Sequence, residues 1–340
     1  MTEAKDEVKK PRVKRPPVLF PKTQQLIGEL EARLGHRLLA YWTSNNGSVC
    51  ANDLVALHNL FQKIGTQNEI SLFIKSRGGD PESALRIVHL MRQYCGRINV
   101  LVPLECASAA TMIALGADVI RMGPLSYLTA VDSSLTHDLS PLDRDNDRVS
   151  VSADELARII RLWRLSGQEH HATNPYSEIF RYIHPLVVGA IDRSSSLSIR
   201  ICAEILRYHM TDDARATAIS QHMNSDYPSH SYPITRREAA RIGLNVEGLD
   251  DETNNMLLVL NEFYSEMGQR AVTDFDECNQ HDNSILNIIE ARDTQIFYQN
   301  ERDWVYLREE RRWRTLNDES TWRKTEVVDG KRRTSRLHIR

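Results

Sequence analysis

Lysine is scarce in this 340-residue chain, and it is unevenly placed. Arginine outnumbers lysine by 34 to nine, and no lysine occurs between Lys75 and Lys324. Chemistry that depends on a lysine amine, as a base or as a nucleophile, is therefore excluded from the long middle of the chain.

Long apolar runs and paired cysteines are also missing. No apolar run approaches the ~18 residues that a membrane-spanning helix needs, and residues 1–22 contain no apolar segment typical of a secretory signal. The five cysteines are odd in number and never spaced as CxxC, which argues against a disulfide framework and a zinc site. We therefore expect a cytoplasmic protein without membrane insertion or a bound metal.

The charge is segregated along the chain. The net charge is −3, but residues 1–22 carry +4 and residues 302–340 carry +5, which leaves −12 on the rest. Basic ends can contact nucleic acid or an acidic protein. No aromatic or glycine pattern of an RNA-binding module accompanies them, so we expect solvated tails and no nucleic-acid partner. A protein partner for the C-terminal extension remains open.

The pattern of apolar residues predicts three regions. Residues 1–22 form a flexible basic lead-in, residues 23–248 form one α/β domain, and residues 249–340 form a helical, arginine-rich extension. Strands and helices alternate between residues 37 and 124, which predicts a mostly parallel sheet. The expected strands are 37–43, 70–75, 98–104 and 117–122, and the expected helices are 23–34, 52–64, 82–94 and 106–116.

Later helices are indicated by capping signals. Ser152 with Glu155 and Thr235 with Glu238 form capping boxes, and Gly243 is a C-cap signal. The stretch 175–210 is expected to be helical, with a kink at Pro185. The three tryptophans beyond residue 300 are expected to pack on their own domain.

Two features carry possible chemistry. Gly78 and Gly79 follow an expected strand, and Ser108 stands before a helix of very small residues. A serine at a helix N-terminus lies beside unpaired backbone N–H groups, and a glycine pair on a neighbouring parallel strand can add more of them. Together these are the parts of an acyl-transfer site, a nucleophile with an oxyanion hole. The alternative is plain structure, with Ser108 as an N-cap and the glycines as a turn.

The segments around these features resemble a known family. The runs LFIKSRGGDPESALRIVHLMR and VLVPLECASAATMIALGADVIRMGPLSYLTAVD, followed by HSYPITRREAARIGLNVE, resemble the serine dehydrogenase proteinase family, which is related to signal peptide peptidase A. The resemblance covers about residues 30–248. It implies a Clp/crotonase-type spiral of β-β-α units and a serine peptidase that acts on polypeptides and assembles into homo-oligomers. Residues 175–210 are expected to contribute to the oligomer contact.

The resemblance also implies roles for single residues. Ser108 falls on the nucleophile, and Gly78, Gly79 and the Ala109 amide fall on the oxyanion hole. The general base is left open. Some relatives use a lysine downstream of the serine, and this chain has no lysine at a corresponding position. His230, Lys75 and His137 are the candidates, in that order, and Asp132 is expected to orient the base. No cofactor is implied.

The sequence also admits two other interpretations and argues against a third. A catalytically inactive Clp-fold scaffold would act through oligomerisation and partner binding, and the absent lysine favours it. An acyl-CoA hydratase-like lyase would need acidic residues at the thioester, for which Glu105 and Asp132 are the candidates. A metal site at His170, His171 and His209 is rejected, because neighbouring helical side chains diverge.

Overall fold

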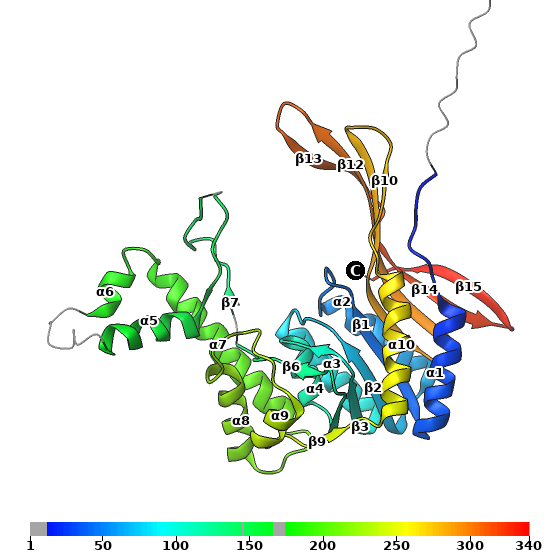
Figure 1. The fold of residues 1–340 in the computed structure, drawn as a ribbon, viewed down its shortest axis with the longest axis horizontal. Helices are drawn as coiled ribbons and strands as arrows, with labels where there is room; N and C mark the ends of the chain where they lie inside the picture. The colour runs from blue at the N-terminus through cyan, green and yellow to red at the C-terminus, as the bar shows by residue number, and fades with distance from the viewer. Residues whose placement is uncertain (1–11, 133, 145, 166–173, 340) are drawn as a thin grey trace, which may run out of the picture.

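The computed structural model describes residues 12–132, 134–144, 146–165 and 174–339. Within them, helices and strands alternate in the first half of the chain, as the sequence predicts (Figure 1). These first elements are α1 (Phe20–Leu34), β1 (Arg37–Thr43), α2 (Ala51–Ile64), β2 (Gln67–Lys75), α3 (Pro81–Tyr94), β3 (Cys95–Val102), β4 (Glu105–Cys106), α4 (Ala109–Leu115) and β5 (Val119–Met122).

The central sheet is mixed, with a parallel core. Strands β1, β2, β3 and β5 pair in parallel in that order, and β9 (Val246–Gly248) adds a further parallel strand beside β5. Right-handed crossover helices connect parallel strands in such sheets and cover both faces. The fold is therefore mixed α/β with a mostly parallel core, as predicted.

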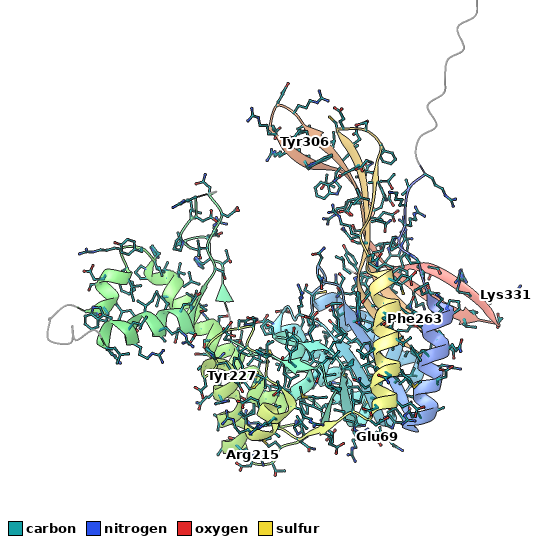
Figure 2. All side chains as sticks on the ribbon, viewed as in Figure 1. Glu69, Arg215, Tyr227, Phe263, Tyr306 and Lys331 are labelled. Carbon is teal, nitrogen blue, oxygen red and sulfur yellow. The ribbon has the colours of Figure 1, made fainter. Side chains whose placement is uncertain are left out.

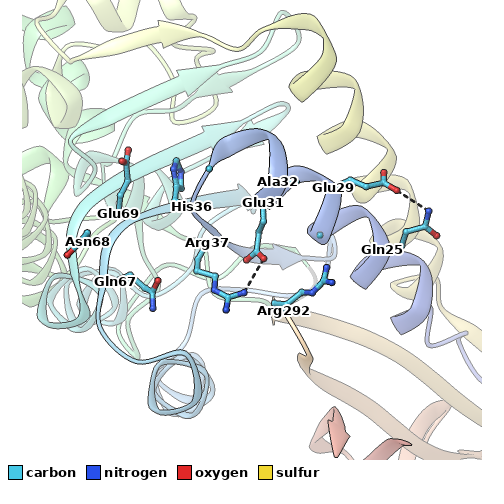
Figure 3. Close-up of a pocket in the computed structure, with 12 residues that line it drawn as sticks. Gln25, Glu29, Glu31, Ala32, His36, Arg37, Gln67, Asn68, Glu69 and Arg292 are labelled. Atoms are coloured by element: carbon cyan, nitrogen blue, oxygen red, sulfur yellow. Dashed lines mark hydrogen bonds and ion pairs between the residues drawn. The ribbon is translucent and has the colours of Figure 1, made fainter. Parts of the chain in front are cut away.

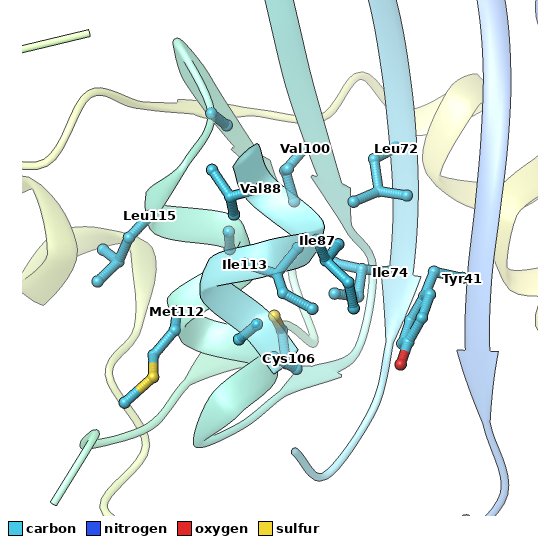
Figure 4. Close-up of a cluster of buried hydrophobic side chains, with 14 of the residues drawn as sticks. Tyr41, Leu72, Ile74, Ile87, Val88, Val100, Cys106, Met112, Ile113 and Leu115 are labelled. Carbon is cyan, nitrogen blue, oxygen red and sulfur yellow. The ribbon is translucent and has the colours of Figure 1, made fainter. Parts of the chain in front are cut away.

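Alternation along the strands separates two hydrophobic cores. In β1, Leu39 and Tyr41 face the larger core with α2, α3 and α4, whereas Leu38 and Ala40 face the core under α1 and α10 (Asp251–Met267). Successive strand residues point to opposite faces, so one strand serves both cores. Figure 4 shows the larger core, where Ile87 of α3 and Ile113 of α4 pack against the sheet residues Ile74 and Val100.

Between β5 and β9 the chain forms short strands and a group of helices. Figure 1 shows α5 and α6 projecting to one side of the sheet. The elements are β6 (Tyr127–Leu128), β7 (Ser134–Leu135), β8 (Val151–Ser152), α5 (Ala153–Leu165), α6 (Pro175–Ile179), α7 (Pro185–Leu206), α8 (Asp213–Ser225) and α9 (Arg236–Arg241). The capping box at α5 is present, with reciprocal bonds between Ser152 and Glu155.

The expected continuous helix over 175–210 is interrupted rather than kinked. The chain leaves α6 after Ile179 and restarts α7 at Pro185. Proline has no N–H to donate and fits the first turn of a helix better than its interior. Pro185 therefore begins a new helix, with the His184 side chain accepting a bond from the Leu186 amide.

The prediction of a helical C-terminal extension holds only for α10 and is wrong for the residues that follow it. After α10 the chain forms only strands among the residues described, and β11 pairs antiparallel with β1, so these strands enlarge the central sheet. The strands are β10 (Ala271–Asp274), β11 (Asn279–Ala291), β12 (Thr294–Leu307), β13 (Arg312–Asp318), β14 (Thr321–Val328) and β15 (Lys331–Leu337). Their charged residues suggested solvated helices, but paired strands satisfy the backbone just as well, and both Trp322 and Thr325 of β14 are buried.

Two ribbons extend this sheet beyond the core. One contains β10, β13 and the adjoining parts of β11 and β12, with Tyr306 near its far end, and the other is the β14–β15 hairpin that carries Lys331 (Figure 2). None of the helices in the described residues is long and apolar enough to cross a membrane. The cytoplasmic location expected from the sequence stays a prediction.

Candidate active site

The diglycine turn follows β2 and lies against the segment that leads to Ser108. The Ser76 amide donates to the Glu105 carbonyl at 3.2 Å, and the Ala107 amide donates to the Ser76 carbonyl at 2.9 Å. These two bonds extend the parallel pairing beyond the main sheet. They bring the turn beside Ser108, although 30 residues separate the two in sequence.

Ser108 has an unusual backbone conformation. Its φ is 53° and its ψ −121°, directly before the first residue of α4, and its side chain is half-buried. A positive φ is costly for a residue other than glycine, and such strain gathers at functional sites. The serine hydroxyl makes no hydrogen bond within the described part of the chain, so it remains available for chemistry.

Gly78 provides the space beside Ser108. Its φ is 99°, and a Cβ atom built on it would lie 2.6 Å from the Ser108 Cβ and 2.9 Å from the Ala109 nitrogen. Only glycine combines this conformation with so close an approach. The structure thus brings Ser108, Gly78 and Ala109 together.

The three expected oxyanion donors are not equivalent. The Gly78 amide donates to the Ser76 Oγ at 3.1 Å and is already engaged. The amides of Gly79 and Ala109 donate to no described residue. Gly78 therefore leaves space beside Ser108, whereas the N–H groups without a partner in the described residues are those of Gly79 and Ala109.

Two threonines that the sequence analysis did not assign support the strained serine. The Ser108 amide donates to Thr129 Oγ1 at 2.8 Å, and the Thr129 amide donates to Thr111 Oγ1 at 3.2 Å. Thr111 in turn donates to the Cys106 carbonyl at 2.7 Å, and both threonines are buried. A signal existed in the sequence, since Thr111 is the only hydroxyl residue within the small-residue helix.

His230 and Asp132 form a pair. The Nδ1 atom of His230 lies 2.7 Å from Oδ1 of Asp132. The hydrogen bond to Asp132 is the main cause that raises the pKa of His230 above its usual value, although burial opposes it. The imidazole is thus oriented by the carboxylate and keeps Nε2 for another partner.

The same short segment carries both halves of the site. Leu128 and Ile234 exchange backbone hydrogen bonds of 3.0 and 2.8 Å, which ties the chain after His230 to the segment before Asp132. Thr129, on that segment, holds the Ser108 amide. Residues 128–132 therefore link the strained serine to the histidine–aspartate pair.

The other two candidate bases have different partners. Lys75 Nζ lies 3.0 Å from Glu105 Oε1, 3.2 Å from the Thr43 carbonyl and over the Trp42 ring. Partial burial acts to raise the pKa of Glu105, but the hydrogen bond and charge of Lys75 lower it overall. The structure therefore places Lys75 in an ion pair rather than against Ser108.

His137 lies in a local turn. Its Nδ1 accepts the Leu139 amide at 3.0 Å, and its carbonyl accepts the Ser140 amide. No described contact joins it to Ser108 or to Asp132. The structure does not bring this candidate into the site.

The residues described contain no cluster of three or more potential metal ligands. The Nε2 atom of His209 donates to the Leu115 carbonyl at 2.8 Å. His170 and His171 lie outside the described residues.

A large hollow lies at the other end of the sheet. A cavity of about 1110 Å³ is bordered by α1 and the first residues of β1 and β2, and Figure 3 shows Arg37 paired with Glu31 in its wall. Ligands of parallel sheets bind outside the carboxyl ends of the strands. Ser76 to Gly79 lie at that end of β2, so this cavity is separate from the candidate active site.

A family comparison fits this geometry. Residues 30–127 match the family model described as Clp protease. This segment is similar to a Clp protease domain. The match is shorter than the resemblance seen in the sequence, and it contains Ser108 and the diglycine turn but neither Asp132 nor His230.

Comparison with solved structures finds several proteins that are similar to this chain. A membrane-bound stomatin-specific protease is 14% identical, with a TM-score of 0.38 over 66% of this chain and 83% of its own. A mutant of that protease with a substrate peptide is 15% identical, with a TM-score of 0.37 over 66% and 78%. ClpP1 from Listeria monocytogenes is 15% identical, with a TM-score of 0.35 over 68% and 99%. No curated protein matches the chain.

Proposed function

We propose that this protein is a Clp-fold serine peptidase that uses Ser108 as its nucleophile. The observation that carries the proposal is the placement of Ser108. Its φ is 53°, its hydroxyl has no partner within the described residues, and the Gly78 turn lies directly against it. Strain at a helix start beside free amides is costly for a fold and useful for acyl transfer.

Each step of hydrolysis has a residue in this proposal. Ser108 Oγ attacks the peptide carbonyl while His230 Nε2 accepts its proton, and Asp132 stabilises the imidazolium that forms. The Gly79 and Ala109 amides bind the oxyanion. His230 then protonates the leaving amine, and a water molecule hydrolyses the acyl-enzyme by the same route in reverse. All of these groups belong to the chain, so the reaction needs no cofactor.

The proposal also includes self-association. The projecting helices expose a series of large apolar side chains, and a surface of this kind marks an interaction site more often than a monomer surface. They are Ile159, Leu162 and Leu165 of α5, Tyr176 of α6, Phe180 and Tyr182 of the following turn, and Leu186 of α7. A homo-oligomer that covers these helices agrees with the oligomer contact expected at residues 175–210.

A fluorophosphonate probe tests the proposed nucleophile. We expect the wild-type protein to be labelled at Ser108 and to cleave casein, and both activities to disappear in Ser108→Ala. Ser177→Ala is the matched control, because Ser177 is an exposed serine on α6. Wild-type protein that is folded and oligomeric but is neither labelled nor active would favour the inactive scaffold instead.

A further inference from the structure

An irregularity in β11 connects the C-terminal strands to the loops beside the candidate active site. The pairing of β11 with β12 shifts register between Ile285 and Asn287, which leaves Leu286 as an extra residue. A bulge of this kind redirects the neighbouring side chains. The Leu286 carbonyl accepts a hydrogen bond from the Ser44 amide at 2.7 Å, so the bulge is bonded to the segment that follows β1.

Asn287, next to the bulge, anchors the loop before α2. Its Nδ2 donates to the Ser48 carbonyl at 2.8 Å and to Asp53 Oδ1 at 2.9 Å, and the side chain is buried. Asp53 is itself buried, and its Oδ2 accepts the Tyr41 hydroxyl and the Cys50 amide. Burial raises the pKa of Asp53 to about 6, against these hydrogen bonds. Residues 48–50 are thereby held at Ser48 by Asn287 and at Cys50 by Asp53.

The fixed loop in turn holds the diglycine turn. The Val49 amide donates to the Gly78 carbonyl at 2.8 Å, and the Asp80 amide donates to the Val49 carbonyl at 2.9 Å. A Cβ atom on Gly79 would lie 2.4 Å from that carbonyl, so the two segments are in close contact.

The geometry of one peptide bond makes this contact relevant to catalysis. The Gly78 carbonyl and the Gly79 N–H belong to the same planar unit, and the described chain contains no cis peptide. When Val49 binds the carbonyl, the Gly79 N–H must point the opposite way, away from residues 48–50. The Val49 bond therefore sets the direction of a free amide in the turn.

We propose that Asn287 is a positioning residue for the oxyanion hole, acting through residues 48–50 on the Gly79 amide. The inference rests on the proposed peptidase function. It assigns to the C-terminal strands, which lie outside the segment that matches the Clp family, a part in the alignment of the active site. Asn287 touches neither the substrate nor Ser108.

The test compares substitutions of two asparagines on the same strand. In Asn287→Ala the Ser48 carbonyl and the Asp53 carboxylate lose a hydrogen-bond donor. We expect kcat for casein-derived peptides to fall about 10- to 100-fold, a decrease no larger than that caused by removing one oxyanion donor. KM should change little, because the oxyanion forms only in the transition state. Asn279→Ala is the control, because Asn279 also binds a carboxylate, that of Asp276, but on the distant ribbon.

Two further measurements separate positioning from misfolding. Asn287→Asp keeps the shape of the side chain without a donor, and we expect it to lose at least as much kcat as the alanine variant. Hydrogen exchange at the Asp80 amide, which is bonded to Val49, should accelerate in both Asn287 variants and not in Asn279→Ala. Thermal melting verifies that each variant is folded.

The outcomes distinguish the two proposals. Labelled wild-type protein with slower turnover in both Asn287 variants, at unchanged KM, supports the inference. Labelled wild-type protein with equal kcat in Asn287→Ala overturns the inference and leaves the peptidase in place. Wild-type protein that the fluorophosphonate does not label overturns the proposed function, and the role of Asn287 in catalysis falls with it.

Discussion

The Nδ1 atom of His230 lies 2.7 Å from Oδ1 of Asp132, across 98 residues of sequence. The contact is made possible by the backbone bonds between Leu128 and Ile234, which hold the two segments together. A carboxylate that binds Nδ1 fixes the tautomer in which Nε2 accepts a proton. Of the two candidate histidines, His230 alone has a carboxylate at Nδ1 among the described residues, because Nδ1 of His137 accepts the Leu139 amide.

Substitution of the candidate bases should separate them. We expect His230→Ala to abolish casein cleavage, because the proton of Ser108 then has no acceptor. Lys75→Met should retain most of the activity of the wild type and lose stability instead, since Glu105 loses its nearest cation. Initial rates and melting temperatures of the two variants, measured side by side, provide the comparison. Full activity of His230→Ala together with an inactive Lys75→Met would reverse the assignment.

The pH dependence should follow the titration of His230. The imidazole must be neutral to accept a proton, and Asp132 raises its pKa above the usual value of 6.5. We therefore expect kcat/KM to increase with pH through an apparent pKa above 6.5.

Asp132→Asn provides the control for this profile. It removes the Asp132 carboxylate, whose hydrogen bond is the main cause that raises the pKa of His230, and leaves burial, which lowers it, so the acidic limb should shift to lower pH. The rate at the plateau should also fall, by up to ~10⁴ where the tautomer is lost. An unchanged acidic limb in this variant would contradict the assignment of the limb to His230.

Gly78→Ala should disable the site. The new Cβ would meet the Ser108 Cβ at 2.6 Å in a backbone conformation with φ of 99°. We expect fluorophosphonate labelling to slow by about 10²-fold or more, comparable to the loss of an oxyanion donor. Gly35→Ala is the matched control, because Gly35 has φ of 77° but no atom within 4 Å of the added Cβ. Equal labelling rates in the two variants would show that the close approach of Gly78 does not matter.

Thr129 should affect the serine through its backbone. Thr129→Val removes the acceptor of the Ser108 amide and leaves that group without a partner, at a cost of about 1–3 kcal/mol. We expect a lower kcat with little change in KM, and recovery in Thr129→Ser, which restores the hydroxyl. Steady-state kinetics of the two variants measure both constants. Equal loss in the valine and serine variants would point to packing rather than to the hydrogen bond.

The projecting helices should be required for assembly. Leu186→Asp places a charge among their exposed apolar residues, and we expect it to reduce the mass measured by light scattering at micromolar concentration. Leu316→Asp is the control, because Leu316 is equally exposed, at 63%, but lies on the C-terminal ribbon. A wild-type protein that is monomeric in this experiment would contradict the proposed oligomer.

The sequence determined the parallel core and one half of the candidate site. Local patterns sufficed there: a short apolar run located β1, proline and glycine marked the turn after β2, and small residues marked α4. The C-terminal extension was misjudged, because dense charge with scattered aromatic residues suits a solvated helix as well as a strand. Its identity depended on the pairing of β11 with β1, a partner some 250 residues away.

Tertiary structure decided the other half. No local signal joins His230 to Asp132, Thr129 to Ser108, or Asn287 to Ser48, since each bond links segments distant in sequence. Secondary structure follows from spacing within a few residues, and an isolated sequence displays that spacing directly. The direction of a hydrogen bond between distant segments depends on how the sheet and its loops pack, so it exists only in the folded chain.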